Sequence, residues 1–174
     1  DGLVFDELGI DHVFIDEFQF FKNMTISSKM ERVAGIQTGG SQRAFDLYMK
    51  AQYLDQQHQG HGITGATGTP VSNSMVELYT LQRYLDPQAL RERGIAHFDA
   101  WAATFGEVIE TMEISPDGRT LRPRQRFAKF INLPELLPMF RSFADVKTTE
   151  QLTLPCPVIQ GGKPQVIACP MDAA

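Results

Sequence analysis

The sequence feature that most constrains the fold is a short apolar run over residues 12–15, His-Val-Phe-Ile, which ends at Asp16 and Glu17. An apolar run of this length is typical of a strand buried in a parallel sheet. Carboxylates that directly follow such a strand lie at the sheet edge where open α/β proteins bind their ligands. The alternative interpretation is an ordinary strand that ends in solvated acids.

Helices and strands are expected to alternate after this run. Apolar side chains recur at helical spacing over residues 41–58, a second short strand follows over 61–66, and a further helix is expected over 75–85. Ser72 or Asn73 could cap this last helix. The order strand, helix, strand, helix predicts a parallel α/β unit.

The second half of the chain has a different pattern. The expected elements are an amphipathic helix over 98–105, a β-hairpin with strands over 108–114 and 119–124, and a helix over 133–143. The turn sequence Ser-Pro-Asp-Gly at 115–118 indicates the hairpin. We expect the last helix to be interrupted at Pro134 and Pro138. Residues 22–42 are expected to form a loop, and 149–164 a linker.

Composition and charge exclude several classes of protein. The formal net charge is −5 over 174 residues, whereas a self-sufficient DNA-binding domain usually has a basic surface. No apolar run approaches the roughly 18 residues of a membrane span. Cys156 and Cys169 have no metal-ligand spacing, so we expect reduced thiols in a cytoplasmic protein. The chain begins at Asp1 and not at a methionine, and we expect a fragment.

Two motifs carry candidate chemistry. The Asp16-Glu17 pair suits ATP hydrolysis, because one carboxylate can hold Mg²⁺ through water while the next polarises the attacking water. The turn Thr-Gly-Thr-Pro at 67–70 combines a glycine that allows close backbone approach with hydroxyls that can bind a neighbour or a ligand. A tight turn between a strand and a helix is the alternative for this second motif.

Together these motifs resemble those of the Swi/Snf-type ATPases of helicase superfamily two. Residues 13–23, with their Asp-Glu-x-Gln box and following Lys-Asn pair, are similar to that family's Walker B segment. Residues 67–87 are similar to its third motif, including a Glu-Leu pair at 77–78. Segments over 98–148 further resemble the large helicases of phages and mobile elements, which are often fused to an adenine-specific DNA methylase. Phe18 departs from the family pattern, which more often has alanine there.

The resemblance implies ATP and Mg²⁺ as cofactors and a role for single positions. Asp16 would hold the Mg²⁺ ion through water, and Glu17 would act as the general base. Gln19 would connect the nucleotide state to the third motif. The positions that would couple hydrolysis to DNA contact are Thr67, Gly68 and Thr69. Lys22 and Asn23 would brace the loop after the acidic box and are weak candidates for contact with nucleic acid.

A basic stretch on and after the hairpin has two interpretations. Arg122, Arg124 and Arg126 could follow a phosphate backbone, with Phe127 and Phe130 as stacking partners. The alternative is a solvated hairpin whose phenylalanines pack inward. The remaining aromatic and imidazole side chains favour structural roles: Trp101 in the core, and His12, His58, His61 and His97 without a metal-ligand spacing.

Parts of a complete motor are missing from the sequence. No Gly-x-x-x-x-Gly-Lys-Thr/Ser loop, which would hold the nucleotide phosphates, occurs in the 174 residues. The arginines of a second motor lobe are also missing, and such an arginine can be worth about 10³ to 10⁵ in rate. We therefore expect the chain by itself to be inactive.

The fold class that follows is α/β: a partial RecA-like parallel-sheet lobe with a mostly helical insertion and a β-hairpin. The expected regions are the C-terminal half of the first lobe over 1–92, the insertion over 93–148 and a linker over 149–174. The expected partners are double-stranded DNA, a second RecA-like lobe in cis and a fused or associated methylase, with no membrane, in the cytoplasm of a bacterium or phage-infected host.

Two rival functions remain open. The first is a catalytically silent interaction module in which residues 97–148 bind a protein partner. The second is an unrelated P-loop enzyme with a similar Walker B strand, against which the stretch over 67–87 argues. For either function, missing sheet strands would leave apolar surface near residues 12–15, so we expect self-association or marginal stability.

Overall fold

The chain divides into two units, Asp1–Ala144 and Asp145–Ala174. The computed structural model describes residues 4–30, 33–34, 36, 39–58, 60, 62–72, 74–115, 117–152, 162 and 167. In the second unit the described part contains a short 3-10 helix, η3 (Thr149–Gln151), at the start of the predicted linker. Both cysteines lie outside the described residues. None of the described helices is long and apolar enough to cross a membrane.

The first half of the chain contains the predicted alternation of strands and helices. Strand β1 (Val13–Ile15) pairs in parallel with β3 (Ile63–Gly65), and the helix α1 (Gln42–His58) lies between them in sequence. Helix α2 (Val76–Leu85) follows β3. The prediction of a parallel α/β unit is therefore confirmed, with mixed α/β as the fold class. Two 3-10 helices that the sequence did not predict, η1 (Phe5–Leu8) and η2 (Phe18–Phe21), flank β1.

Ser72, one of the two predicted caps of α2, does not cap the helix. The helix begins at Val76 with Met75 in the N-cap position, and the backbone N–H of Val76 donates to the Ser74 hydroxyl over 3.3 Å. The backbone N–H of Ser72 donates instead to the Glu77 carboxylate over 2.7 Å, which holds Ser72 outside the helix. Asn73 lies outside the described residues.

Helix α2 ends where the sequence predicted, but another helix follows at once. Asp86 is the C-cap of α2 and the N-cap of α3 (Pro87–Glu92), where its carboxylate accepts a hydrogen bond from the backbone of Ala89 over 3.2 Å. Proline suits the first helical position because its missing N–H would have no partner there. Pro87 therefore both ends one helix and begins the next. Helix α4 (Phe98–Phe105) confirms the predicted amphipathic helix.

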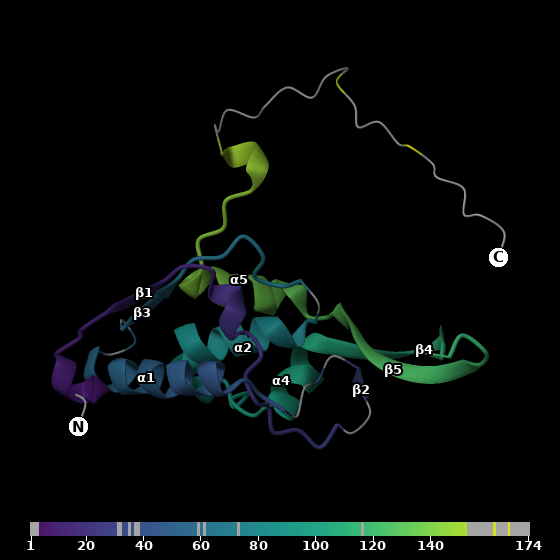
Figure 1. The fold of residues 1–174 in the computed structure, drawn as a ribbon, viewed down its shortest axis with the longest axis horizontal. Coiled ribbons are helices and arrows are strands. Elements are labelled where there is room, and N and C mark those ends of the chain that lie inside the picture. Colours follow the sequence, from purple (N-terminus) through teal and green to yellow (C-terminus); the bar gives the residue numbers. More distant parts are fainter. Residues whose placement is uncertain are drawn as a thin grey trace. The chain divides into compact units, whose positions relative to one another are not determined.

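The predicted hairpin is present and longer than expected. Strands β4 (Gly106–Ile114) and β5 (Leu121–Phe130) pair antiparallel, with a bulge between Glu107 and Val108 (Figure 1). A two-residue strand, β2 (Val33–Ala34), adds to β5 in parallel. Part of the segment predicted to be a loop over 22–42 thus belongs to a second sheet, whose order is β2-β5-β4.

Helix α5 (Leu133–Phe143) is continuous, so the predicted interruptions are wrong. Pro134 lies in the first turn, where its missing N–H removes no helical hydrogen bond. Pro138 lies inside the helix and removes one such bond. Leu136 and Met139 are buried against the rest of the core, and this packing offsets the lost bond.

Among the described residues, two clusters of buried side chains form the core of the first unit. The larger cluster joins α2, α4 and α5, and its aromatic centre is Tyr79 with Phe98 at 5.2 Å and Trp101 at 5.5 Å between ring centroids. Trp101 is completely buried, which confirms its structural interpretation. This cluster contains residues from both sides of position 92, and the region boundary expected there stays a prediction. The smaller cluster packs η2 against α1 and α2.

The β1–β3 sheet has an exposed apolar side chain on one face. Phe14 on β1 is 79% exposed and lies opposite Thr64 on β3, whereas the neighbouring Ile15 and Ile63 pack on the smaller core cluster. Parallel sheets usually have both faces covered. Each strand of this two-stranded sheet also has an unpaired edge within the described part of the chain.

We predict that this chain, expressed by itself, self-associates through the β1–β3 sheet. Sedimentation velocity over a range of concentrations should give an average mass that rises with concentration. Phe14→Thr keeps the preference for strand while it removes the exposed ring, and should lower the association. Val4→Thr, which removes another exposed apolar side chain outside the sheet, is the matched control. A concentration-independent monomer would contradict the prediction.

Candidate functional site

The candidate site lies where β1 and β3 end side by side. The backbone N–H of Ala66 donates to the Ile15 carbonyl over 2.8 Å, and the N–H of Phe18 donates to the Ala66 carbonyl over 2.9 Å. These bonds continue the parallel ladder past the strand ends. As a result the acidic pair at 16–17 and the turn over 67–70 lie at the same edge of the sheet.

Glu17 has an unusual backbone conformation. Its φ angle of 53° places it in the left-handed region, which non-glycine residues seldom adopt and which is enriched at functional sites. The Asp16 carboxylate accepts a hydrogen bond from the Glu17 N–H over 2.8 Å. The turn leaves both acidic side chains exposed and directs the next side chain, Phe18, into the core.

Phe18 fits in the core because Gly65 has no side chain. A Cβ atom at Gly65 would lie 2.6 Å from two carbon atoms of the Phe18 ring, Cγ and Cδ1. The ring also packs edge-on against Tyr84, with 5.3 Å between centroids. The bulkier residue at position 18 is therefore accommodated by the glycine on the neighbouring strand.

Tyr84 on α2 links α1 and η2 next to the candidate site. Its hydroxyl donates to the carbonyl of Ala44 on α1 over 2.6 Å and lies 3.2 Å from the carbonyl of Phe21 in η2. Burial raises the pKa of the Tyr84 hydroxyl far above its ordinary value. The group therefore keeps its proton and remains a donor at any physiological pH.

A chain of hydrogen bonds joins the acidic pair to the Thr-Gly-Thr-Pro turn. The amide nitrogen of Gln19 donates to the Glu17 carboxylate over 2.5 Å, and the Thr67 hydroxyl donates to the amide oxygen of Gln19 over 2.5 Å. The backbone N–H of Thr69 donates to the Thr67 hydroxyl over 3.1 Å. The structure thus brings together Glu17, Gln19, Thr67 and Thr69, while their catalytic and coupling roles stay predictions.

Gly68, between the two threonines, is not explained by close packing. A Cβ atom there would meet no described atom within 4 Å. Within the described part of the chain, nothing occupies the space next to this glycine.

A second contact joins the same two loops through α2. The Lys22 ammonium lies 2.9 Å from the Glu77 carboxylate and donates to the Ser72 hydroxyl over 2.5 Å. The Lys22 side chain is 13% exposed and the Glu77 side chain 8%. Asn23 is exposed, and its backbone carbonyl accepts a hydrogen bond from Ser41 over 2.8 Å. From the sequence, Glu77 was identified only in the Glu-Leu pair at 77–78 and not as a partner of Lys22; its charge, opposite to that of Lys22, was the signal for the pairing.

The chemistry of the acidic pair fits a magnesium ion that is bound mainly through water and phosphate oxygens. Mg²⁺ keeps several waters and needs only one or two protein carboxylates, and Asp16 and Glu17 are exposed at the sheet edge. Among the described residues, no group of three His, Cys, Asp or Glu side chains could hold a metal ion. The described histidines contact protein groups instead; His12, for example, bonds the Thr64 hydroxyl over 2.9 Å.

The hairpin arginines are exposed and partly paired. Arg126 and Arg124 lie 2.6 and 3.5 Å from the Glu113 carboxylate, and Arg122 is the cross-strand neighbour of Glu113. Phe127 is buried against Gly106, where a Cβ atom would overlap its ring. The hairpin side chains thus divide into arginines that reach solvent and a phenylalanine that packs inward, while contact with nucleic acid stays a prediction.

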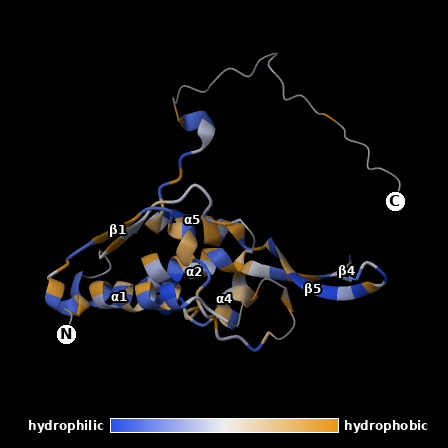
Figure 2. Cartoon of the chain, viewed as in Figure 1, coloured by the Kyte–Doolittle hydropathy of each residue, from blue (hydrophilic) through white to orange (hydrophobic). Residues whose placement is uncertain are grey.

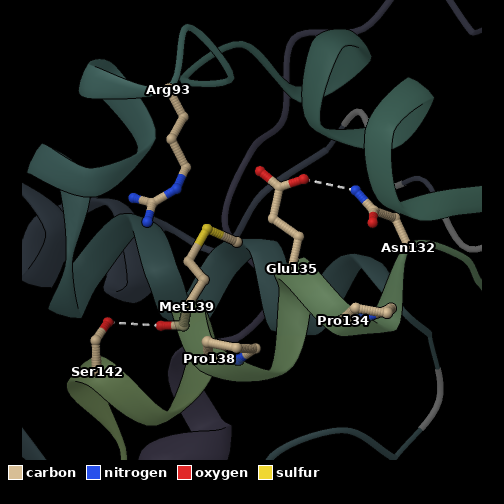
Figure 3. Close-up of a pocket in the computed structure, with 7 residues that line it drawn as sticks. All are labelled: Arg93, Asn132, Pro134, Glu135, Pro138, Met139 and Ser142. Atoms are coloured by element: carbon tan, nitrogen blue, oxygen red, sulfur yellow. Dashed lines mark hydrogen bonds between the residues drawn. The ribbon is translucent and has the colours of Figure 1, made fainter.

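A surface pocket of about 480 Å³ lies along α5 and was not predicted from the sequence (Figure 3). Asn132, with φ at 51°, donates to the Glu135 carboxylate over 2.6 Å at this site. The residues that line the pocket are Arg93, Asn132, Pro134, Glu135, Pro138, Met139 and Ser142. It shares none of these residues with the acidic pair or the Thr-Gly-Thr-Pro turn.

Comparison with known proteins finds two similarities. The sequence profile of a family described as a probable helicase domain matches residues 1–148. The chain is also 27% identical over 153 residues to the Defense against restriction protein B of Escherichia phage P1. This alignment covers 85% of the chain and 7% of the phage protein, so the chain spans a small part of that relative's length. No solved structure is significantly similar to the chain.

We predict that Gly65→Ala destabilises the first unit, because the added methyl group collides with Phe18. Overpacking of this kind typically costs about 1–3 kcal/mol in the free energy of unfolding, which urea denaturation measures. Gly68→Ala is the matched control and should change stability by less than about 0.5 kcal/mol. In a Phe18→Ala background the Gly65→Ala substitution should cost less; equal costs in both backgrounds would show that the two positions do not interact.

Proposed function

Because the chain belongs to the family of probable helicase domains, we propose that it is part of a DNA-dependent ATPase motor of the Swi/Snf type. The motor would use Mg²⁺ and ATP to move along DNA or to remodel it. The single observation that carries the proposal is the hydrogen-bond chain from Glu17 through Gln19 to Thr67. It connects an acidic pair suited to hydrolysis with a loop that is free to contact a second ligand.

Asp16 and the residues of this hydrogen-bond chain each have a task in the proposed motor. Asp16 would hold the Mg²⁺ shell through water, and Glu17 would orient the attacking water and accept its proton. Magnesium, when bound, neutralises charge on the transferring phosphate. The Gln19 amide nitrogen donates to Glu17, and the amide oxygen accepts from Thr67. A shift of the threonine loop would therefore change how Glu17 is held.

The proposed architecture places this chain within a larger protein. Strands β1 and β3 would be two strands of a RecA-like lobe that other segments complete, and residues 93–148 would be an insertion before the linker to a second lobe. The phosphate-binding loop and the arginines of the second lobe would come from those other segments. The phage relative supports an origin in a phage or mobile element. A location in the bacterial cytoplasm and an associated methylase are further parts of the proposal.

The hairpin offers a contact with DNA in this proposal. Arg122, Arg124 and Arg126 alternate along β5 and therefore point to one face of the strand, where all three are exposed. Glu113 neutralises part of this charge, so the contact would be a local addition to a DNA site formed mainly elsewhere.

A second candidate function is favoured by the other face of the same hairpin. Exposed apolar side chains occupy it, with Ile114 70% and Met112 and Leu121 each 62% exposed, and Val108 next to the body of the unit. Figure 2 shows that the hairpin is largely hydrophilic, with some hydrophobic positions along it. Such a surface is typical of a protein interaction site, so a silent interaction module is the alternative.

We predict that the full-length parent hydrolyses ATP, that DNA stimulates this hydrolysis, and that Glu17→Gln abolishes it. Loss of a general base typically lowers the rate by about 10² to 10⁴. Steady-state phosphate release with and without duplex DNA measures the effect. Glu150→Gln changes an exposed glutamate in η3 and is the matched control. A folded parent that hydrolyses no ATP under any condition would favour the interaction module.

We further predict that the two hairpin faces have separable effects. The triple variant Arg122→Gln, Arg124→Gln, Arg126→Gln should weaken binding of the parent to duplex DNA and reduce its salt dependence, because each lost phosphate contact lowers the slope of log K against log salt by about 0.9. The double variant Met112→Ser, Leu121→Ser should leave both quantities unchanged. Fluorescence anisotropy at several salt concentrations measures them. Unchanged affinity and salt dependence in the triple variant would contradict the proposed DNA contact and leave protein contact as the role of the hairpin.

A further inference from the structure

The buried Glu77 carboxylate on α2 contacts both loops of the candidate site, the one after the acidic pair and the one after the Thr-Gly-Thr-Pro turn. One of its oxygens pairs with the Lys22 ammonium over 2.9 Å, and the other accepts the backbone N–H of Ser72 over 2.7 Å. Lys22 in turn donates to the Ser72 hydroxyl over 2.5 Å. Lys22 follows η2 after the acidic box, and Ser72 follows the Thr-Gly-Thr-Pro turn, so a single side chain of α2 holds the far ends of both loops.

Burial makes this contact different from a surface ion pair. Exposed pairs contribute little because water competes for both charges. Here both side chains are mostly removed from solvent, and Glu77 lies on a helix that is buried on almost all sides. Removing one partner would leave the other charge buried and uncompensated, which is strongly unfavourable. The pair therefore remains formed while the surrounding core is intact.

The same burial argues against Lys22 as a contact for DNA phosphate. Its ammonium already has a carboxylate and a hydroxyl within hydrogen-bond distance, and the side chain is 13% exposed. To reach a phosphate it would have to leave Glu77. The geometry instead favours the bracing role among the two that the sequence suggested for this residue.

The two loops are thus connected twice. Near their beginnings, the Gln19 amide accepts from the Thr67 hydroxyl; at their ends, Lys22 and Ser72 meet on Glu77. A single hydrogen bond between exposed loops would let one loop rotate about the other. The second connection removes that freedom, so a displacement of the threonine loop has to move the acidic box with it.

We infer that the Lys22–Glu77 pair is a positioning element that holds the Thr67–Ser72 loop in register with Glu17, so that contact of DNA with that loop is transmitted to the hydrolytic residues. The inference rests on the proposed motor function. Neither residue touches the reacting atoms, and both act through the loops that they hold.

The test uses the full-length parent with Lys22→Met, with Glu77→Gln and with both substitutions together. Lys22→Met keeps the length of the side chain and removes the charge, and Glu77→Gln keeps an acceptor for the Ser72 N–H. Each single variant should retain hydrolysis without DNA and affinity for a non-hydrolysable ATP analogue. Stimulation of kcat by DNA should fall by about 5- to 150-fold, the usual range of coupling between two sites.

The double variant separates positioning from stability. It leaves no buried charge unpaired, and neutral replacement of a buried pair is often tolerated. We expect its melting temperature to return toward that of the wild-type protein, while DNA stimulation stays low. Amide hydrogen exchange over residues 67–72 should remain faster than in the wild type, which is a readout independent of activity. Lys50→Met removes the exposed pair of Lys50 with Asp46 and is the matched control.

Each outcome has a separate meaning. Recovery of DNA stimulation together with the melting temperature would overturn the inference and leave a merely structural ion pair. Unchanged stimulation in the single variants would also overturn it, while the proposed motor would stand. A wild-type parent without DNA-stimulated hydrolysis would overturn the proposed function, and the inference with it.

Discussion

Strands β1 and β3 pair in parallel over three residues each, and the candidate site depends on this contact. Because both strands run in the same direction, the residues that follow them emerge at one edge, and the hydrogen bonds of Ala66 keep the chains together beyond the strand ends. An antiparallel pairing would place the acidic box and the Thr-Gly-Thr-Pro turn at opposite ends of the sheet. The contact between Gln19 and Thr67 is a direct consequence of strand direction.

Helix α2 connects this edge to the rest of the first unit. Its side chains enter both core clusters, with Tyr79 in the larger and Tyr84 in the smaller, and Glu77 reaches the loops of the site. A helix that is buried on nearly all sides has little freedom to shift, since every displacement disturbs close packing. The site therefore has a rigid base under two exposed loops, which is the arrangement that a coupling element between two ligands requires.

Sequence patterns predicted the elements that carry their own periodic signal. The strand before Asp16, the amphipathic helix around Trp101 and the hairpin agree with the structure. The errors arose where a long-range contact outweighed a local preference. Ser72 does not cap α2 because Glu77 binds it, and Pro138 does not break α5 because Leu136 and Met139 are packed in the core. Strand β2 has two residues and exists through its pairing with β5, which no local pattern indicates.

By itself the sequence determined the chemistry that is available: an acidic pair after a short apolar strand, a threonine turn after a second strand, and arginines along a hairpin. These follow from residue type and spacing, which are local properties. Only the tertiary structure decided which of these groups meet. It placed Phe18 against Gly65 and buried the Lys22 side chain against Glu77. Such contacts join residues tens of positions apart, and their geometry is set by packing that no single segment encodes.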